Sequence, residues 1–386
     1  MCKDLQFIMI FPVKCLILFY VIIPAFSYSQ PKGKSGLLRV CYYTLDNPVT
    51  HLNTSLCTHI ILGFSSVSNG VIDLGSEERK KLYFQTTALK NKDPQLKMLL
   101  TVGGGGNAGG FSEAFNSTGN RTRFIFSALA TLGKYNFDGL DIDWEFPVWN
   151  DNVLEDKNNF ALFMKEFKFL SEVYASLVHK PPAILSIAVA AVSGIIDVAY
   201  DIPIMAKYAD FINLMSYDFH DFFWYYPFTG HNSPLFNNSK EEAYFSTLNT
   251  AWAADYWNKK GMPKSKIMIG IPTYAHTYTL LNPLFHDVDA PATGTKGDIT
   301  FSDVCNLLAS GGIRVFDNES RVPYAYRGYE WVSYEDQVSI YGKAKWILQE
   351  GYGGAMTYNL NSDDWSCACN KTSFPLHEII YNVFTK

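Results

Sequence analysis

The sequence predicts a closed (β/α)8 barrel, the TIM-barrel fold of the α/β class, with a small α+β insertion between its seventh and eighth strands. Short, almost continuously apolar runs alternate along the chain with longer segments of helical periodicity. Strands of a parallel sheet have this composition because helices cover them. The runs number eight, as in a closed barrel with right-handed crossovers. An open doubly wound sheet is the alternative topology.

The predicted strands follow a short lead-in that contains Gly and Ser. They are Leu38–Tyr43, His59–Phe64, Lys97–Val102, Gly139–Glu145, Ile184–Ala190, Phe211–Ser216, Ile267–Ile271 and Gly354–Tyr358. The clearest helical segment repeats its apolar residues every 3.6 positions. That stripe comprises Phe160, Phe163, Met164, Phe167, Leu170, Tyr174 and Leu177. The stretch 273–329 breaks the alternation and is rich in Pro, Gly and Thr, so we expect it to be the insertion, with barrel parts at 30–272 and 330–386.

Composition limits the classes of function. The 386 residues are 48% hydrophobic and 18% charged, which is typical of a globular protein. A formal net charge of −5, without a basic stripe, argues against a nucleic-acid partner. Aromatic residues make up 16% of the chain, which suits either a large core or a surface that stacks on sugar rings. No CxxC or HExxH motif predicts a zinc site, and we expect neither a metal nor a cofactor.

Residues 1–29 have the pattern of a signal peptide. Positively charged Lys3 and Lys14 precede an apolar run from Cys15 to Phe26, and small residues such as Ser27 suit a cleavage site. A signal anchor is the alternative, if the apolar residues before Lys14 join that run. We therefore expect a secreted protein, or one in a lumenal compartment such as the lysosome, that is a monomer and free of the membrane after cleavage.

Cysteines and sequons agree with an oxidising compartment. Beyond the signal, five cysteines predict two disulfide bridges and one leftover thiol. They are Cys41, Cys57, Cys305, Cys367 and Cys369. Six N-x-[ST] sequons are candidate glycosylation sites. They lie at Asn53, Asn116, Asn120, Asn237, Asn318 and Asn370.

The fourth predicted strand carries a row of acids. Because side chains alternate between the faces of a strand, Asp141, Asp143 and Glu145 share one face, and Ile142 and Trp144 share the other. Neighbouring carboxylates on a buried strand cannot all stay ionised, so at least one pKa must rise. A site that needs a protonated carboxylic acid at neutral pH would keep such a row. A salt-bridged strand edge and a calcium site are the structural alternatives.

The pattern Asp138-x-x-Asp141-x-Asp143-x-Glu145 resembles the signature of glycoside hydrolase family 18, the chitinases and chitinase-like lectins. Other stretches resemble the same family in the same order over roughly 38–384. They are Cys41-Tyr42-Tyr43, Cys57-Thr58-His59, Thr101-Val102-Gly103-Gly104, Met215-Ser216-Tyr217-Asp218, Gly230-His231-Asn232-Ser233-Pro234-Leu235, Gly270-Ile271-Pro272-Thr273-Tyr274 and Gly353-Gly354-Ala355-Met356.

The resemblance implies retaining hydrolysis of β-1,4-linked N-acetylglucosamine in chitin or chitooligosaccharides, with the substrate's own acetamido oxygen as nucleophile. Glu145 is then the acid and base, Asp143 and Asp141 assist it, Tyr217 donates to the acetamido carbonyl, and Asp138 is structural. The implied substrate-binding residues are Tyr42, Phe64, Gly104, Trp144, Met215, Asp218, Tyr274 and Tyr358. By the same resemblance Cys41 pairs with Cys57 and Cys305 with Cys369.

The sequence also departs from the family's pattern. Tyr358 stands where Trp is usual, His276 where Arg is usual, and Gly105 and Leu45 where Trp is frequent. Aromatic residues instead crowd 222–228, after the sixth predicted strand. We expect His220 and His231 to be hydrogen-bonded loop residues. These departures leave two alternatives to a chitinase, namely a secreted lectin with little or no turnover and a hydrolase acting on N-glycan cores or another amino sugar.

Overall fold

The computed structural model describes residues 36–47, 49–107, 109–149, 153–369 and 372–386. The predicted signal peptide at 1–29 and the sequon at Asn370 lie outside these residues. Within them, no helix combines the length and the apolar character that crossing a bilayer requires.

Eight parallel strands form a closed barrel. Their order is β1, β15, β8, β7, β6, β5, β4 and β2, and β1 also pairs with β2, so the sheet has no open edge. The closed barrel confirms the predicted fold and excludes the doubly wound sheet. The strands are β1 Leu38–Tyr43, β2 His59–Ser68, β4 Lys97–Gly103, β5 Gly139–Asp143, β6 Ile184–Val189, β7 Phe211–Leu214, β8 Ile267–Pro272 and β15 Gly354–Tyr358. A short strand, β3 (Val71–Asp73), continues from β2 as a hairpin.

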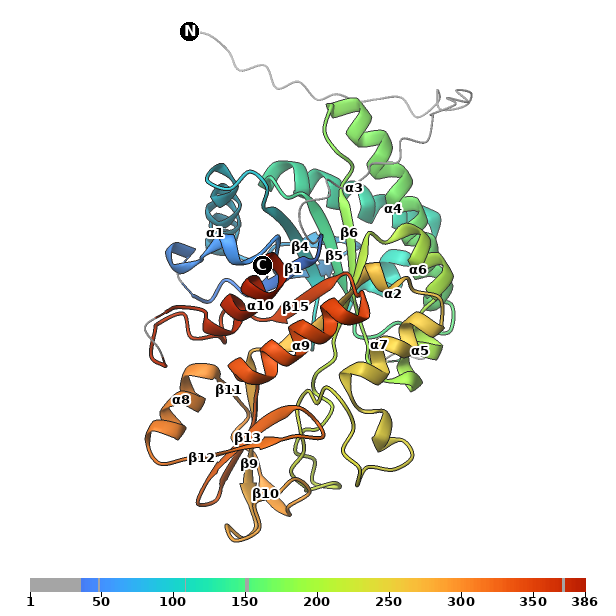
Figure 1. The fold of residues 1–386 in the computed structure, drawn as a ribbon. Coiled ribbons are helices and arrows are strands. Elements are labelled where there is room, and N and C mark those ends of the chain that lie inside the picture. The colour runs from blue at the N-terminus through green and yellow to red at the C-terminus, as the bar shows by residue number, and fades with distance from the viewer. Residues whose placement is uncertain (1–35, 48, 108, 150–152, 370–371) are drawn as a thin grey trace. The chain divides into compact units, whose positions relative to one another are not determined.

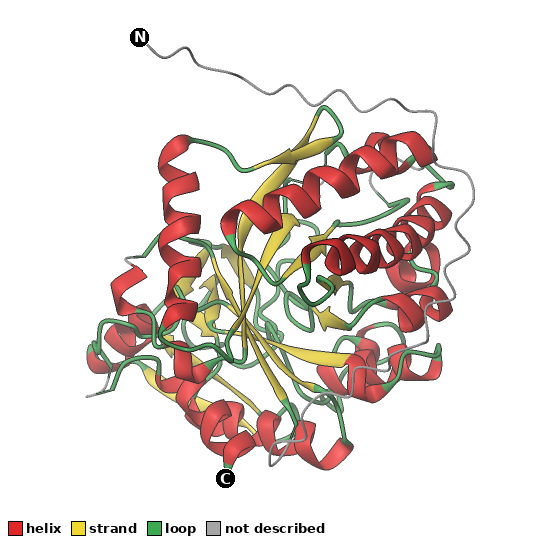
Figure 2. Cartoon of the chain, turned by 90° about the horizontal axis from the view of Figure 1, so that it is seen from above, coloured by secondary structure: helices red, strands yellow, loops and turns green. Residues whose placement is uncertain are grey.

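Helices surround the barrel strands (Figure 2). They are α1 Glu77–Thr87, α2 Phe111–Phe115, α3 Thr118–Tyr135, α4 Asp156–Val178, α5 Ser193–Ala199, α6 Ile202–Tyr208, α7 Thr250–Lys259, α9 Gln337–Glu350 and α10 Pro375–Thr385. The apolar stripe predicted for α4 is buried from Phe160 to Phe167, but Leu177 is 75% exposed. A helix of 23 residues is about 34 Å long. The five-residue strand β5 is much shorter, so the last turns of α4 have little sheet to pack against.

Two apolar clusters pack on the two sides of the barrel strands. The larger lies between the strands and the surrounding helices, and the smaller lies inside the barrel. Buried members of the inner cluster are Val40, Tyr42, Ile61, Leu99, Phe211, Met268 and Met356. The partly buried Phe64, Met215, Tyr217 and Tyr358 pack against them. Predicted site residues therefore lie at one end of the barrel's own core.

The insertion is a second, antiparallel sheet with one helix, which groups apart from the barrel strands in Figure 1. It comprises β9 Tyr274–Leu280, β10 Ala292–Gly294, β11 Asp298–Thr300, α8 Phe301–Ala309, β12 Ile313–Asp317, β13 Val322–Arg327 and β14 Glu330–Ser333. The sheet extends past the predicted limit at residue 329, because β14 pairs with both β13 and β9. The Gly and Tyr at 328–329 form the hairpin turn within the sheet.

Both predicted disulfides are present. Cys41–Cys57 links β1 to the segment before β2, and Cys305–Cys369 links α8 to the segment before α10. Cys367 is exposed and is a free thiol.

A buried lysine connects α9 to the loop after β7. Lys343 of α9 is fully buried and donates hydrogen bonds to Ser233 and to the carboxylate of Glu335, which directly follows the insertion. Ser233 in turn donates to the carbonyl of Ser216, just after β7, at 2.6 Å. Three segments at the end of the barrel therefore share one buried charged group.

We predict that Lys343→Met lowers the free energy of unfolding by about 3–5 kcal/mol, because it leaves the buried Glu335 carboxylate without its cationic partner. Urea denaturation followed by fluorescence measures the change. Lys259→Met removes a lysine whose side chain is 73% exposed and serves as the control. The prediction is wrong if both substitutions cost the same. Adding Glu335→Gln to the Lys343→Met chain should restore much of the loss.

Candidate active site

The three acids of the β5 row project from one face, as alternation requires. Asp141 and Asp143 are buried inside the strand, whereas Glu145, two residues past its end, is partly exposed. Trp144 lies on the other side, where its ring stacks on Phe111 at 5.3 Å between centroids and meets Phe160. The structure therefore does not bring Trp144 together with the other predicted site residues, and its burial in the outer core gives no support to a sugar contact.

Asp141 is held by hydrogen-bond donors. One oxygen accepts from Tyr42 Oη at 2.7 Å, and the other accepts from Ser186 Oγ at 2.5 Å and Asn213 Nδ2 at 3.1 Å. Burial raises the pKa of Asp141, and these donors oppose the rise because they stabilise its charged form. Ion-pair partners belong instead to Asp138, which contacts Lys90 at 2.8 Å. Neither a strand-edge salt bridge nor a calcium site fits this environment, since donors rather than carbonyl oxygens face Asp141.

The next two acids have raised pKa values. Burial, and then the charges of Glu145 and Asp141, raise the pKa of Asp143 well above its ordinary value. Its Oδ1 atom is buried and has no hydrogen-bond partner among the described residues. Burial, and then the charge of Asp218, raise the pKa of Glu145 to about 7. Glu145 is therefore present in both protonation states near neutral pH, as a group that gives and then takes a proton must be.

Two glycines at the end of β4 allow the backbone to approach β5 closely. Gly103 has a φ of +106°, and a Cβ atom there would lie 2.1 Å from the carbonyl oxygen of Asp143. Gly104 donates its N–H to that same oxygen at 2.7 Å, and a Cβ on it would overlap the Phe64 ring. A side chain at either position would displace Asp143 or Phe64. Gly105 lies beside Glu145, since a Cβ there would be 3.7 Å from Oε1.

Tyr358 is the centre of a group of aromatic rings. Its ring centroid lies 5.7 Å from that of Tyr42, 6.3 Å from Phe64, 6.2 Å from Tyr217 and 6.0 Å from Tyr274. The four partners come from β1, β2, the segment after β7, and β9. Met215 packs on the same inner core. The structure therefore brings together all the predicted aromatic site residues except Trp144.

Asp218 joins this group through the insertion. Its carboxylate accepts hydrogen bonds from Tyr274 Oη and from His276 Nε2, the latter at 3.0 Å. Asp218 has a φ of +56°, a conformation that is costly for most residues, and its N–H donates to Asn232 Oδ1 at 2.7 Å. Asn232 belongs to the Gly230–Leu235 motif, so that motif sets the direction of the Asp218 side chain.

His276 must carry a positive charge in this setting. Its Nδ1 atom lies 2.8 Å from the carbonyl oxygen of His220, and Nε2 lies 3.0 Å from Asp218 and 3.5 Å from Asp298. Every neighbour is an acceptor, so both ring nitrogens must donate, which only the imidazolium can do. Burial disfavours the charge, but the hydrogen bond and the charge of Asp218 outweigh it and raise the pKa of His276 to about 9. The ring therefore keeps the positive charge that an arginine would supply.

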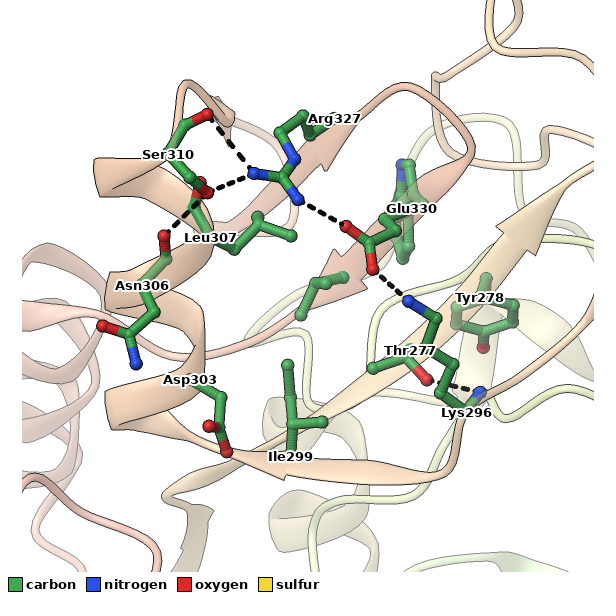
Figure 3. A pocket seen from close by; sticks show the side chains of 12 residues that line it. Thr277, Tyr278, Lys296, Ile299, Asp303, Asn306, Leu307, Ser310, Arg327 and Glu330 are labelled. Carbon is green, nitrogen blue, oxygen red and sulfur yellow. Dashed lines mark hydrogen bonds and ion pairs between the residues drawn. The ribbon is translucent and has the colours of Figure 1, made fainter.

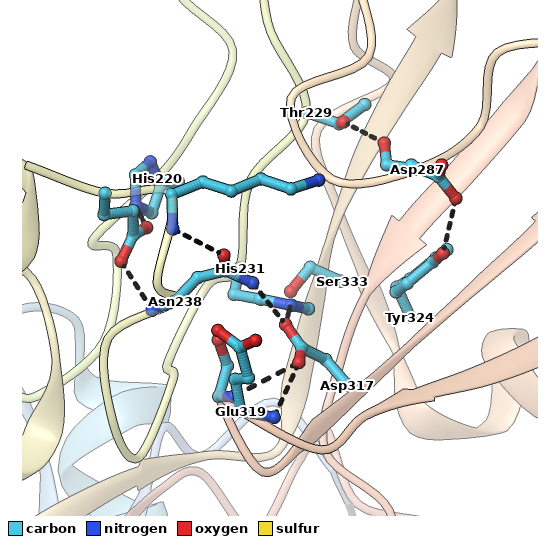
Figure 4. Close-up of polar contacts among 12 residues, drawn as sticks. His220, Thr229, His231, Asn238, Asp287, Asp317, Glu319, Tyr324 and Ser333 are labelled. Atoms are coloured by element: carbon cyan, nitrogen blue, oxygen red, sulfur yellow. Dashed lines mark hydrogen bonds and ion pairs between the residues drawn. The ribbon is translucent and has the colours of Figure 1, made fainter.

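The other two histidines of the region lie beside carboxylates. The predicted hydrogen bond is confirmed for His231 but not for His220, whose Nε2 atom has no hydrogen-bond partner among the described residues. His231 Nε2 lies 3.1 Å from Asp317 of β12, a pair that joins the loop after β7 to the insertion (Figure 4). His220 Nε2 lies 3.4 Å from Glu241. Among the described residues, no three or more His, Cys, Asp or Glu side chains are grouped so as to hold a metal ion.

Two residues of the site escaped the sequence analysis. Ser186 in β6 and Asn213 in β7 are fully buried, and both donate to Asp141. A signal was present, because each is the single polar residue in an otherwise apolar strand. Inward-facing polar residues on the two strands that follow β5 are the natural partners of a buried carboxylate.

A separate hollow lies in the insertion, away from these residues (Figure 3). Leu307 and Ile299 line its apolar part, and Glu330 lies between Lys296 and Arg327 at its rim. These charged groups satisfy one another, so the hollow adds nothing to the site at the barrel end.

Comparison with known proteins agrees with this geometry. The family model of the glycosyl hydrolases family 18 matches residues 39–363. Chitotriosidase-1 of Mus musculus is 34% identical over 336 residues, which cover 84% of this chain and 71% of that protein. The oviduct-specific glycoprotein of Mesocricetus auratus is 33% identical over 378 residues, and the chain spans only 55% of its length.

Solved structures show the same similarity. The immunomodulatory active chitinase of Trichuris suis superposes with a TM-score of 0.85 at 33% identity, covering 90% of this chain and 99% of that one. Human YKL-39, described as a pseudo-chitinase with retained chitooligosaccharide binding, superposes with a TM-score of 0.85 at 30% identity, covering 91% of this chain and 100% of that one. The fold, the acidic strand and the match over most of the described chain lead to one conclusion: this protein belongs to glycosyl hydrolase family 18.

Proposed function

We propose that this protein hydrolyses β-1,4-linked N-acetylglucosamine chains, with Glu145 as the acid and base. The observation that carries the proposal is the environment of Glu145. Its pKa of about 7 makes it a proton donor at neutral pH, and it follows two buried acids on one face of β5. Carboxyl groups with pKa values shifted by burial and a neighbouring charge gather at catalytic sites.

The reaction divides into two steps at the anomeric carbon. In the first step, Glu145 gives its proton to the glycosidic oxygen as the bond between that oxygen and the anomeric carbon breaks. The acetamido oxygen of the sugar that holds this carbon forms a new bond to the anomeric carbon. The resulting oxazolinium ring carries a positive charge. Water then attacks the anomeric carbon, the ring opens, and Glu145 takes a proton from the water. The configuration at the anomeric carbon is retained.

Asp143 and Asp141 assist this chemistry. The unpartnered Oδ1 of Asp143 is available to accept the acetamido N–H, which gains positive character as the ring forms. A negative Asp143 at that stage requires its proton to move to a neighbour, and Asp141, whose own pKa is raised by burial, is the carboxylate that takes it up. Tyr217 stays protonated because burial raises its pKa well above the ordinary value, so it can donate to the acetamido carbonyl.

Tyr358 and its partner rings are the proposed platform for the reacting sugar. The apolar face of a pyranose ring packs on an aromatic ring, and Tyr358 is partly exposed at the centre of its group. Tyr42, Phe64, Met215 and Tyr274 support that ring, and Gly104 gives Phe64 its place. We assign His276 a positioning role, because its charge holds the half-exposed Asp218 carboxylate next to Tyr274.

We further propose that the chain is secreted as a monomeric glycoprotein after removal of residues 1–29. Asn53, Asn116, Asn237 and Asn318 are exposed, so an attached glycan would meet no packing obstacle. Asn120 is less suited, because its side-chain amide donates to the carbonyl of Glu113 and to Asn116.

A lectin without turnover is the second candidate. The specific observation in its favour is Tyr358, because a tyrosine offers less stacking area than the tryptophan usual at this position and holds a distorted sugar less firmly. The similarity to the pseudo-chitinase YKL-39 fits that reading. Glu145 opposes it, since the chain keeps the acid with a raised pKa. Oligosaccharide binding without any cleavage product would support the lectin.

If the proposal is right, the protein turns over a small substrate. A fluorogenic chitobiose glycoside should be cleaved by the protein, and Glu145→Gln should lower kcat by at least about a hundredfold, because the amide has no proton to transfer. Asp138→Asn, which alters an acid at the other end of β5, should leave kcat nearly unchanged. Equal rates for the protein and Glu145→Gln would exclude hydrolysis at this site, and oligosaccharide binding by both would then support the lectin.

The acid role of Glu145 also predicts how kcat/KM depends on pH. Because Glu145 must be protonated in the first step, kcat/KM should fall as pH rises through about 7. Above that value the loss should approach roughly tenfold per pH unit. Initial rates in buffers of constant ionic strength measure the profile. A flat profile up to pH 9 would contradict the proposed acid role.

The contacts of His276 predict an unusual pKa for its ring. Its ring should titrate near pH 9, above the ordinary value of 6.5, and Asp218→Asn should lower that pKa. The stability that the charged ring contributes is fully present below 6.5 and is lost as pH rises through about 9. Nuclear magnetic resonance of carbon-labelled histidine measures the titration, and His276→Gln identifies the signal. A ring that is neutral at pH 7.5 would contradict the assignment.

A further inference from the structure

Three buried polar side chains form a hydrogen-bonded chain behind the end of β15. Thr357 Oγ1 lies 2.8 Å from His377 Nε2, and His377 Nδ1 lies 2.7 Å from Asp363 Oδ2. The three residues are only 1–2% exposed. We call them the buried triad. Polar groups lose free energy when they leave water unless they are hydrogen-bonded, so the members of the triad depend on one another.

The order of hydroxyl, imidazole and carboxylate is that of a nucleophile triad, but the burial excludes that use. No substrate reaches a hydroxyl on a residue that is 2% exposed. The Nδ1 atom of His377 faces a carboxylate and therefore carries a hydrogen, and in the neutral ring Nε2 then accepts from the Thr357 hydroxyl. The other acceptor near that hydroxyl, the carbonyl oxygen of Val40, is 3.4 Å away. His377 is therefore the main partner of Thr357.

Capping of α10 explains only one member of the triad. The N-cap residue of this helix, Phe374, makes no side-chain cap bond. Asp363 Oδ2 instead accepts from the N–H groups of Leu376 at 3.2 Å and His377 at 3.1 Å, which otherwise have no partner in the helix. A cap needs neither an imidazole nor a hydroxyl from a strand. The two remaining members therefore connect the capped helix to β15, which is a separate role.

The end of β15 has few ladder bonds of its own. On the β1 side, pairing ends at Thr357, opposite Cys41. On the β8 side, Tyr358 lies opposite Pro272, which has no N–H to donate, and the Tyr358 carbonyl accepts from Thr273 N–H at 2.9 Å instead. Because side chains alternate, Tyr358 packs on the inner core and Thr357 faces the surrounding helices. The bond to Thr357 therefore holds the strand from behind, one residue before the proposed sugar platform.

We propose that His377 and Asp363 are positioning residues, which act through Thr357 to hold Tyr358 under the reacting sugar. This inference rests on the proposed function for the role of Tyr358. Asp363 orients the imidazole ring, and the ring orients the hydroxyl on the strand, so the geometry of the platform is set by a second layer of hydrogen bonds. A misplacement of about 1 Å at a reacting group can cost about a hundredfold in rate, so such a layer affects turnover without touching the substrate.

The experiment removes single members of the triad. Thr357→Val removes the hydroxyl and keeps the branched shape, Thr357→Ser keeps the hydroxyl, and His377→Leu removes the imidazole. The matched control is Thr86→Val, which removes a buried hydroxyl that donates to the Leu82 carbonyl within α1 at 2.8 Å. Each substitution is also made together with Tyr358→Ala, which completes a double-mutant cycle. Initial rates with the fluorogenic chitobiose glycoside give kcat and KM.

We expect Thr357→Val and His377→Leu to lower kcat roughly tenfold and to change KM much less, because a displaced ring supports the distorted sugar less well than the relaxed one. Thr357→Ser should keep most of the rate, and Thr86→Val should match the parent. In chains that carry Tyr358→Ala, neither triad substitution should lower kcat further, because the ring through which they act is gone. Equal losses with and without that ring would overturn the proposal, as would equal rates for Thr357→Ser and Thr357→Val.

A measurement without substrate separates this outcome from the proposed function. Fluorine nuclear magnetic resonance of chains labelled with fluorotyrosine reports on the surroundings of Tyr358, whose signal is identified by its absence from Tyr358→Phe. If the glycoside is not cleaved, the proposed hydrolysis fails and this signal decides alone. A shift in both His377→Leu and Thr357→Val, absent from Thr86→Val, would uphold the positioning role. An unmoved signal in either triad variant would refute it.

Discussion

The site depends on one electrostatic constraint, the burial of like-charged carboxyl groups on a single strand of an apolar barrel. Asp141 and Asp143 cannot both be ionised cheaply in that interior, and donors surround only Asp141. The charge therefore concentrates on Asp141 and the pKa of Asp143 rises, while burial and the charge of Asp218 raise the pKa of Glu145 at the edge of the barrel. Asp141 lies among donors, Asp143 is buried with an unpartnered oxygen, and Glu145 is partly exposed. Because their environments differ, the three acids can take different roles in the proposed reaction.

A second set of charges keeps the opposite wall in place. Asp218 has its side chain 57% exposed and its backbone in the left-handed region, and contacts from two other segments hold it. The support comes from the insertion through the cationic His276 and from the Gly230–Leu235 motif through Asn232. The buried Lys343 then ties that motif to α9 through Ser233. The insertion is thus part of the site, because it supplies Tyr274 and His276 and holds the loop that contains Asp218.

Alternation and periodicity are local properties, so they predicted the barrel and the shared face of the β5 acids, and the family resemblance predicted the disulfide pairing. Sequence reasoning missed what depends on long-range packing. The donors Ser186 and Asn213 are far from Asp141 in sequence, and only the barrel brings them together. Strand alternation already placed Trp144 on the face opposite the acids, and family resemblance alone suggested a sugar contact there. The charge of His276 was also out of reach, since it follows from three acceptors contributed by two separate segments, the one at 218–220 and the one that contains Asp298.

The departures from the family pattern reduce the aromatic surface around the reacting sugar. Tyr358 offers less area under the reacting sugar than a tryptophan would, and Gly105 leaves open a position where the family often has a ring. A chain that gave up contact area near the reacting bond without replacement would bind substrate weakly, since stacking supplies much of the contact with a flat sugar ring. The turn after β7 carries exposed aromatic area of its own, anchored by Phe222 in the apolar core of the insertion and by the stacking of Tyr226 on Phe245.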